Sequence, residues 1–211
     1  MVCGTITIER VSLVDAKRLW NAMVKDAHNL LPKIFPEVFS SVTIVEGCGG
    51  VGTIKHTTFT PGIILKKWTS EHYACAFNYF LHRNSLSVAI GFQKNSTNLS
   101  YNYTVFHFRI AANKQFSYVK ERVDEIDEEK LVYKYTVIEG GSLGDKLIAL
   151  SFHLKFVARE EKGCVLTRTA SYETVLDAQF DEESVKQIRE SMNPVFGKIE
   201  QYLLSNPKLY F

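Results

Sequence analysis

The last long segment of the chain, Asp181–Leu204, has the pattern of an amphipathic helix and therefore needs a large apolar surface to lie on. Pro194 lies inside the segment and is expected to kink the helix. The apolar residues that recur at helical spacing are Val185, Ile188, Met192, Val195, Phe196, Ile199, Leu203 and Leu204.

The rest of the chain supplies such a surface, because it contains a series of strand-like segments separated by turn residues. The expected strands are Gly4–Val11, Val42–Val45, Gly52–Phe59, Phe116–Asp127, Leu131–Glu139, Leu147–Ala158 and Cys164–Val175. Between the first two, Ser12–Asp15 begins a helical segment that Pro32 and Pro36 are expected to divide into two short helices. The pattern predicts an α+β fold in which an antiparallel meander grasps the last helix, with a cavity between the two.

Residues 62–110 differ in composition from the rest of the chain. They include ten aromatic residues but one carboxylate, Glu71, whereas the other 162 residues hold 22 of the 23 acidic groups. They also contribute +4 to a net charge of +2, so the remainder carries 2 − 4 = −2, and we expect no stable complex with nucleic acid. The flanking sequences HTTFTP and AANKQFSY have the signals of one hairpin. We predict a single domain over 1–211, interrupted by an insertion at 62–110.

The cysteine spacing and the N-terminal sequence indicate the compartment. Cys3, Cys48, Cys75 and Cys164 lack the spacing of a zinc site, and no signal peptide is recognisable. No apolar run approaches the roughly 20 residues of a membrane span. We therefore expect a reduced cytoplasmic protein, with the nucleus as an additional compartment, and neither a metal nor a cofactor.

Four motifs in order along the chain resemble those of the plant pathogenesis-related class ten proteins, the family of the birch-pollen major allergen. They are GCGGVGTIK (Gly47–Lys55), FSYVKERVDEID (Phe116–Asp127), YKYTVIEGGSLGD (Tyr133–Asp145) and KIEQYLL (Lys198–Leu204). The resemblance implies the helix-grip fold, in which a seven-stranded antiparallel sheet wraps around a long C-terminal helix, with two short helices in a V and a large internal cavity. It also implies a monomeric defence-related protein that binds flavonoids, cytokinins, sterols or other hormone-like amphipathic molecules.

The family has only a few loop residues where residues 62–110 lie, and its genes commonly carry an intron there. Gly62 as GGT would supply a splice donor, and Ile110 with Ala111 as ATA-GCA would supply an acceptor. We interpret the stretch as a translated, retained intron. The alternative is a functional insertion that adds an aromatic interaction surface.

Candidate ligand-binding residues come from this resemblance and from strand alternation. Tyr118, Tyr133 and Tyr135 match family positions that line or border the cavity, and Lys55 is expected to meet an acidic group of the ligand. His28 matches a position near the cavity entrance that is often acidic. Expected cavity walls, each with plain core packing as the alternative, are Met23, Phe116, Leu150, Phe152, Leu154, Val195 and Phe196.

A ribonuclease is the enzymatic alternative. Lys55, Glu200 and Tyr202 match positions named in the family's ribonuclease hypothesis, in which a carboxylate acts as base. Glu200 and Tyr202 are two residues apart on a helix, so at most one of them can face a cavity. The glycine-rich loop lacks a Walker lysine, and its glycines Gly47, Gly49, Gly50 and Gly52 are interpreted as turn residues.

Two other activities of the superfamily have less support. The loops TPGI and GGSLGD match neither the gate nor the latch of the abscisic-acid receptors that inhibit phosphatases. The lysine and acidic groups of the alkaloid-forming members cannot be placed. The sequence therefore favours a non-catalytic carrier of a small amphipathic ligand.

Overall fold

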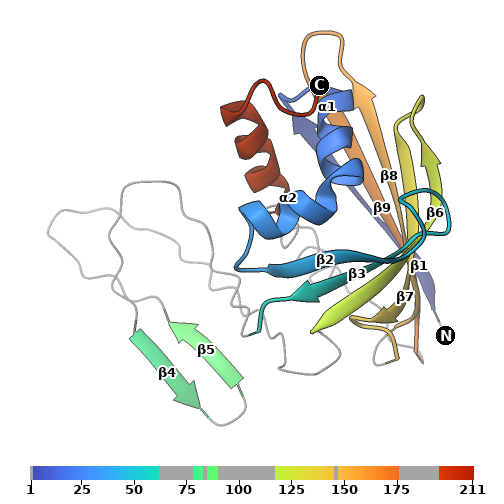
Figure 1. The fold of residues 1–211 in the computed structure, drawn as a ribbon. Helices are drawn as coiled ribbons and strands as arrows, with labels where there is room; N and C mark the ends of the chain where they lie inside the picture. Colours follow the sequence, from blue (N-terminus) through green and yellow to red (C-terminus); the bar gives the residue numbers. More distant parts are fainter. Residues whose placement is uncertain (1, 62–77, 83–84, 90–116, 145–146, 176–194) are drawn as a thin grey trace, which may run out of the picture.

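A seven-stranded antiparallel sheet forms the framework of this computed structural model, which describes residues 2–61, 78–82, 85–89, 117–144, 147–175 and 195–211 (Figure 1). Its strands follow the order β1-β9-β8-β7-β6-β3-β2, so β7 is the middle strand. They are β1 (Cys3–Ser12), β2 (Phe39–Glu46), β3 (Ile54–Phe59), β6 (Tyr118–Asp127), β7 (Val132–Gly140), β8 (Leu147–Ala158) and β9 (Cys164–Thr174). The prediction of seven antiparallel strands is confirmed.

Helical segments lie together beside the sheet and cover one of its faces (Figure 1). They are α1 (Ala16–Trp20), the π-helical segment η1 (Asn21–Lys25), α2 (Ala27–Ile34) and a C-terminal helix whose described part spans 195–205. The side chain of Asp15 caps α1 by accepting hydrogen bonds from the Lys17 and Arg18 amides, at 2.9 and 3.2 Å. The predicted helix over 181–194 lies outside the described residues.

One detail of the helix prediction is wrong. Pro32 does not divide the helical segment but lies inside α2, where it removes only one backbone hydrogen bond. The break between η1 and α2 falls at Asp26, whose φ of −114° and ψ of 11° are not helical. α2 ends at Ile34, and the next residue, Phe35, precedes Pro36. A residue before proline is disfavoured in the helical conformation, which accounts for the end of the helix at this point.

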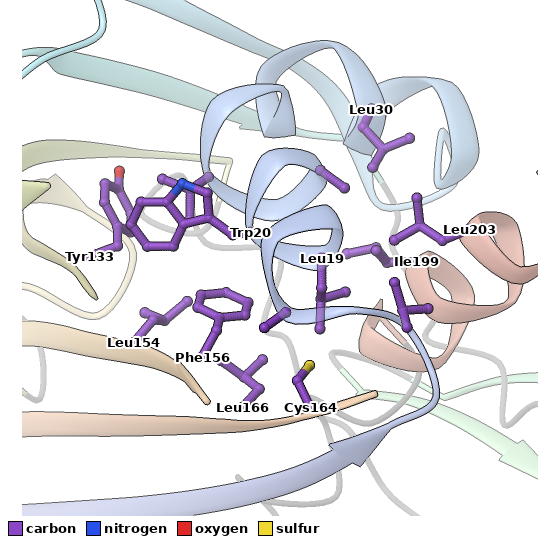
Figure 2. Close-up of a cluster of buried hydrophobic side chains, with 14 of the residues drawn as sticks. Leu19, Trp20, Leu30, Tyr133, Leu154, Phe156, Cys164, Leu166, Ile199 and Leu203 are labelled. Carbon is purple, nitrogen blue, oxygen red and sulfur yellow. The ribbon is translucent and has the colours of Figure 1, made fainter. Parts of the chain in front are cut away.

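The hydrophobic core lies between the helices and the inner face of the sheet, the face that carries Tyr133, Leu154 and Leu166 (Figure 2). Trp20 is fully buried, and its ring meets Phe156 edge-on at a centroid distance of 5.6 Å. Ile199 and Leu203 of the C-terminal helix are buried in the same cluster. The helices and the sheet therefore share one core.

The connection that contains residues 62–110 joins two strands that are already neighbours. Thr58 of β3 pairs with Tyr118 of β6, and the Phe59 amide donates to the Ser117 carbonyl at 2.9 Å. Within the connection, β4 (Asn78–His82) and β5 (Ser85–Ala89) pair with each other as a separate two-stranded sheet. The two ends of the connection therefore meet in one hairpin ladder.

Across the described parts of the chain, no helix combines the length and apolar character needed to cross a membrane.

Arg18 joins α1 to the C-terminal helix and the residues after it. The side chain is 7% exposed and donates to the carbonyls of Leu203, Asn206 and Leu209, at 2.5, 2.5 and 2.7 Å. The last residue, Phe211, also packs against the guanidinium, whose carbon lies 5.2 Å from the ring centroid.

We expect Arg18→Met to lower the free energy of unfolding by about 2–4 kcal/mol, because three carbonyls lose a charged donor. Chemical denaturation followed by circular dichroism measures this change. Arg159→Met is the matched control, since Arg159 is exposed and makes one ion pair of 3.6 Å with Glu161. Its expected effect is within about 0.5 kcal/mol. Equal effects of the two variants would contradict the structural role of Arg18.

Candidate ligand-binding site

Tyr133 and Tyr135 form an aromatic platform on the middle strand, β7. They are 5% and 9% exposed, and their ring centroids lie 5.4 Å apart. Phe152 of β8 stacks on Tyr135 at 4.9 Å, while Trp20 meets Tyr133 edge-on at 6.5 Å. The predicted pair of tyrosines thus lies on the inner face of the sheet, beneath α1.

Lys55 reaches this platform from β3. Its side chain is buried at 8% exposure, and Nζ donates a hydrogen bond of 3.2 Å to the hydroxyl of Tyr133. Nζ also lies 5.2 Å from the centroid of the Tyr133 ring. Burial lowers the pKa of Lys55, and the charge of Glu121 partly opposes that shift.

Glu121 of β6 is paired with Lys55 in the strand register and was not predicted from the sequence. Burial raises the pKa of the Glu121 carboxyl, although the charges of Lys55 and Arg168 act in the opposite direction. Strand alternation could have revealed the position of Glu121, because it lies between Val119 and Val123, which are both buried. The buried face of β6 therefore carries a carboxyl.

Arg168 of β9 reaches the platform from the other side and was also not predicted. Its Nη2 donates to the hydroxyl of Tyr135 at 3.2 Å, and its guanidinium carbon lies 4.3 Å from the centroid of the Phe152 ring. Burial raises the pKa of Tyr135 to about 12 in spite of the nearby Arg168 charge, so the phenol keeps its proton at neutral pH. The sequence signal for Arg168 was its place between Leu166 and Ala170 on one face of the strand.

The structure brings most of the predicted apolar walls to this side of the sheet. Leu154 is buried in the core, and Met23, Phe152, Val195 and Phe196 are partly buried against it. Leu150 is half-buried on the same strand face as Phe152 and Leu154. Phe116 lies outside the described residues.

Tyr118 and His28 lie away from the platform. Tyr118 is on the opposite face of the sheet, where its ring meets His56 at 5.2 Å and its hydroxyl donates to Glu139 at 2.6 Å. His28 lies on α2, and its Nε2 is 3.1 Å from the side-chain nitrogen of Asn29.

The glycine-rich loop is a tight connection between β2 and β3. Gly47, Gly49 and Gly52 have φ of 85°, 100° and 85°, which a residue with a side chain rarely adopts, whereas Gly50 is not among the positive-φ glycines. The Gly49 amide donates to the Thr53 hydroxyl at 2.9 Å, and the Gly52 amide donates to the Val123 carbonyl at 2.8 Å. These two amides are thus used within the fold.

The three residues of the ribonuclease hypothesis, Lys55, Glu200 and Tyr202, each bind a different part of the protein. Glu200 accepts hydrogen bonds from the Ser12 hydroxyl and the Leu13 amide, at 2.7 and 2.9 Å. The Tyr202 hydroxyl accepts from Lys33 of α2 at 3.2 Å. Lys55 contacts Tyr133 instead, so the structure shows no direct contact among Lys55, Glu200 and Tyr202 within the described residues.

Comparison with known proteins identifies related chains. The model of the Pathogenesis-related protein Bet v 1 family matches residues 98–206. The major allergen Pru ar 1 of Prunus armeniaca is 31% identical over 206 residues, which cover 98% of this chain and 97% of the allergen. Among solved structures, Ara h 8.0201 has a TM-score of 0.61 at 24% identity, covering 97% of this chain and 99% of its own. Norcoclaurine synthase from Thalictrum flavum has a TM-score of 0.57 at 20% identity, covering 97% and 88% respectively. The two structures support the same fold.

We expect Glu200→Ala to lower the free energy of unfolding by about 1–3 kcal/mol, because Ser12 is buried and would lose its acceptor. Thermal and chemical denaturation test this expectation. Glu161→Ala is the control, since that side chain is 87% exposed. If Glu200→Ala left stability unchanged and abolished RNA cleavage by nuclease-free protein, Glu200 would be a catalytic residue instead of a structural one.

Proposed function

The chain belongs to the Pathogenesis-related protein Bet v 1 family, and on that premise we propose that it binds a small amphipathic ligand against the inner face of its sheet. The ligand classes expected from the sequence are flavonoids, cytokinins, sterols and other hormone-like molecules. Binding requires no covalent step.

The observation that carries this proposal is the presence of polar groups among the buried rings. Lys55 and Glu121 have pKa values shifted toward their neutral forms, which means that burial outweighs their mutual attraction. Lysine and glutamate are rarely buried in a core whose only role is packing. Perturbed ionisable groups beside an aromatic platform are typical of binding sites.

The ring platform and the polar groups suit different parts of one ligand. Tyr133, Tyr135 and Phe152 offer ring surface, while Lys55 and the tyrosine hydroxyls offer hydrogen bonds. We further propose that the protein acts as a monomer in the cytoplasm and takes part in plant defence. Free, exposed Cys3 and Cys48 are compatible with a reducing compartment.

The first test is a titration with N-phenyl-1-naphthylamine, a neutral amphipathic dye whose fluorescence increases in apolar surroundings. We expect saturable one-to-one binding by the full chain. Phe152→Ala should weaken it about tenfold or more, because the variant removes ring surface from the platform.

Val157→Ala is the control on the same strand, since Val157 is 45% exposed and lies on the other strand face. Circular dichroism establishes that both variants fold. Non-saturable binding by the wild-type protein, or equal weakening by the two variants, would contradict the proposed site.

We also propose that residues 62–110 are an insertion within a single domain, read from a retained intron. The direct pairing of β3 with β6 supports this, because the ladder needs only a short connection. Abundant peptides from 62–110 in the plant tissue would contradict the retained-intron origin.

Deletion of residues 62–110 should raise the melting temperature and strengthen dye binding. The connection between β3 and β6 shortens from 58 residues (60–117) to the 9 left after removal of 49. The smaller loop-closure entropy corresponds to about 1.5 kcal/mol, or about 3–6 °C in melting temperature. Differential scanning calorimetry measures the shift. A lower melting temperature with weaker dye binding would mean that the insertion is part of the functional fold.

A further inference from the structure

Two cationic side chains approach the tyrosine platform from opposite sides. Lys55 comes from β3 and Arg168 from β9, while the tyrosines lie on β7, between these two strands in the sheet order. Each cation donates to one tyrosine hydroxyl, at 3.2 Å in both cases. The two hydroxyls, on rings 5.4 Å apart, are thus flanked by an ammonium and a guanidinium.

The hydroxyl protons of Tyr133 and Tyr135 are available for a further acceptor. Lysine and arginine only donate hydrogen bonds, so each tyrosine oxygen acts as acceptor and its own proton points elsewhere. Among the described residues, neither hydroxyl makes a hydrogen bond besides these two. A buried donor without an acceptor is unfavourable, and a ligand oxygen would satisfy both hydroxyls.

The charges on this face also favour an anion. The strand register places Lys55, Arg168 and Arg10 on the inner face, the last through its pairing with buried Leu166. Among the described strand residues, Glu121 is the one carboxylate on this face. The charge of Glu121 interacts with both Lys55 and Arg168, and burial raises the pKa of Glu121 and lowers that of Lys55.

Arg168 is held in a fixed orientation. Its guanidinium lies 4.3 Å from the centroid of the Phe152 ring, while Nη2 is bonded to Tyr135. A planar, permanently charged group in this position is suited to a carboxylate or a sulfonate.

We propose that the ligand carries an anionic group, which the Tyr133 and Tyr135 hydroxyls bind between Lys55 and Arg168, and that Arg168 determines the preference for anionic over neutral amphiphiles. This inference rests on the proposed binding function and specifies the ligand's chemistry.

Two dyes that differ by one sulfonate test it on the full chain. They are 8-anilinonaphthalene-1-sulfonate and its neutral counterpart, N-phenyl-1-naphthylamine. We expect the wild-type protein to bind the sulfonate about tenfold more tightly or better. Arg168→Met should weaken sulfonate binding about tenfold more than it weakens neutral-dye binding, whereas Arg168→Lys should restore part of the difference.

Arg159→Met is the control and should change neither affinity. Tyr135→Phe keeps the ring and removes one hydroxyl, so it provides a second test should Arg168→Met fail to fold; we expect it to weaken sulfonate binding more than neutral-dye binding. Saturable binding of the neutral dye, with the sulfonate binding no tighter or insensitive to both variants, would overturn this inference alone. Absence of saturable binding of either dye would overturn the proposed function as well.

Discussion

The burial of Arg18 determines how the helices are held over the sheet. Guanidinium keeps its charge and offers five donors in a fixed plane, so one side chain can satisfy carbonyls from several turns. Here it binds carbonyls at the end of the C-terminal helix and in the residues that follow. Tyr210 adds a hydrogen bond of 2.5 Å from its hydroxyl to Asp26, and its carbonyl accepts from Asn21 at 3.2 Å. α1, η1 and the C-terminal residues therefore form one interconnected unit.

The apolar core and the polar groups occupy different positions on the face of the sheet that this unit covers. Trp20, Phe156 and Leu203 belong to the buried cluster beneath the helices (Figure 2). Lys55 and Glu121 lie on β3 and β6, toward the β2 edge of the sheet. Their pKa values shift toward the neutral forms, so their attraction does not compensate for burial, and an apolar pair would fit a purely structural face better. The proposed ligand binding would account for such groups on this face.

Strand alternation predicted much of the sheet but not its charged residues. The seven strands and the shared face of Leu150, Phe152 and Leu154 follow from a period of two. Glu121 and Arg168 were missed because charged residues in a strand are usually assigned to the solvent side, although the same alternation places them with buried neighbours. Tyr118 shows the reverse situation: family resemblance suggested the cavity, whereas its contact with His56 places it on the other face. Glu200 could not be assigned from the sequence, because its partners Ser12 and Leu13 are distant along the chain.

The pairing of β3 with β6 fixes the position of Lys55 relative to the connection that contains residues 62–110. Thr60 anchors the start of the connection, since its amide donates to the Val38 carbonyl at 3.0 Å and its hydroxyl donates to the Pro36 carbonyl at 2.7 Å. The Thr58–Tyr118 pair lies at the end of the β3–β6 ladder nearest the connection, and the Lys55–Glu121 pair lies three register steps farther along the ladder. Backbone hydrogen bonds of β3 with β2 and β6 fix that register, so a change in the connection reaches Lys55 only through the strands.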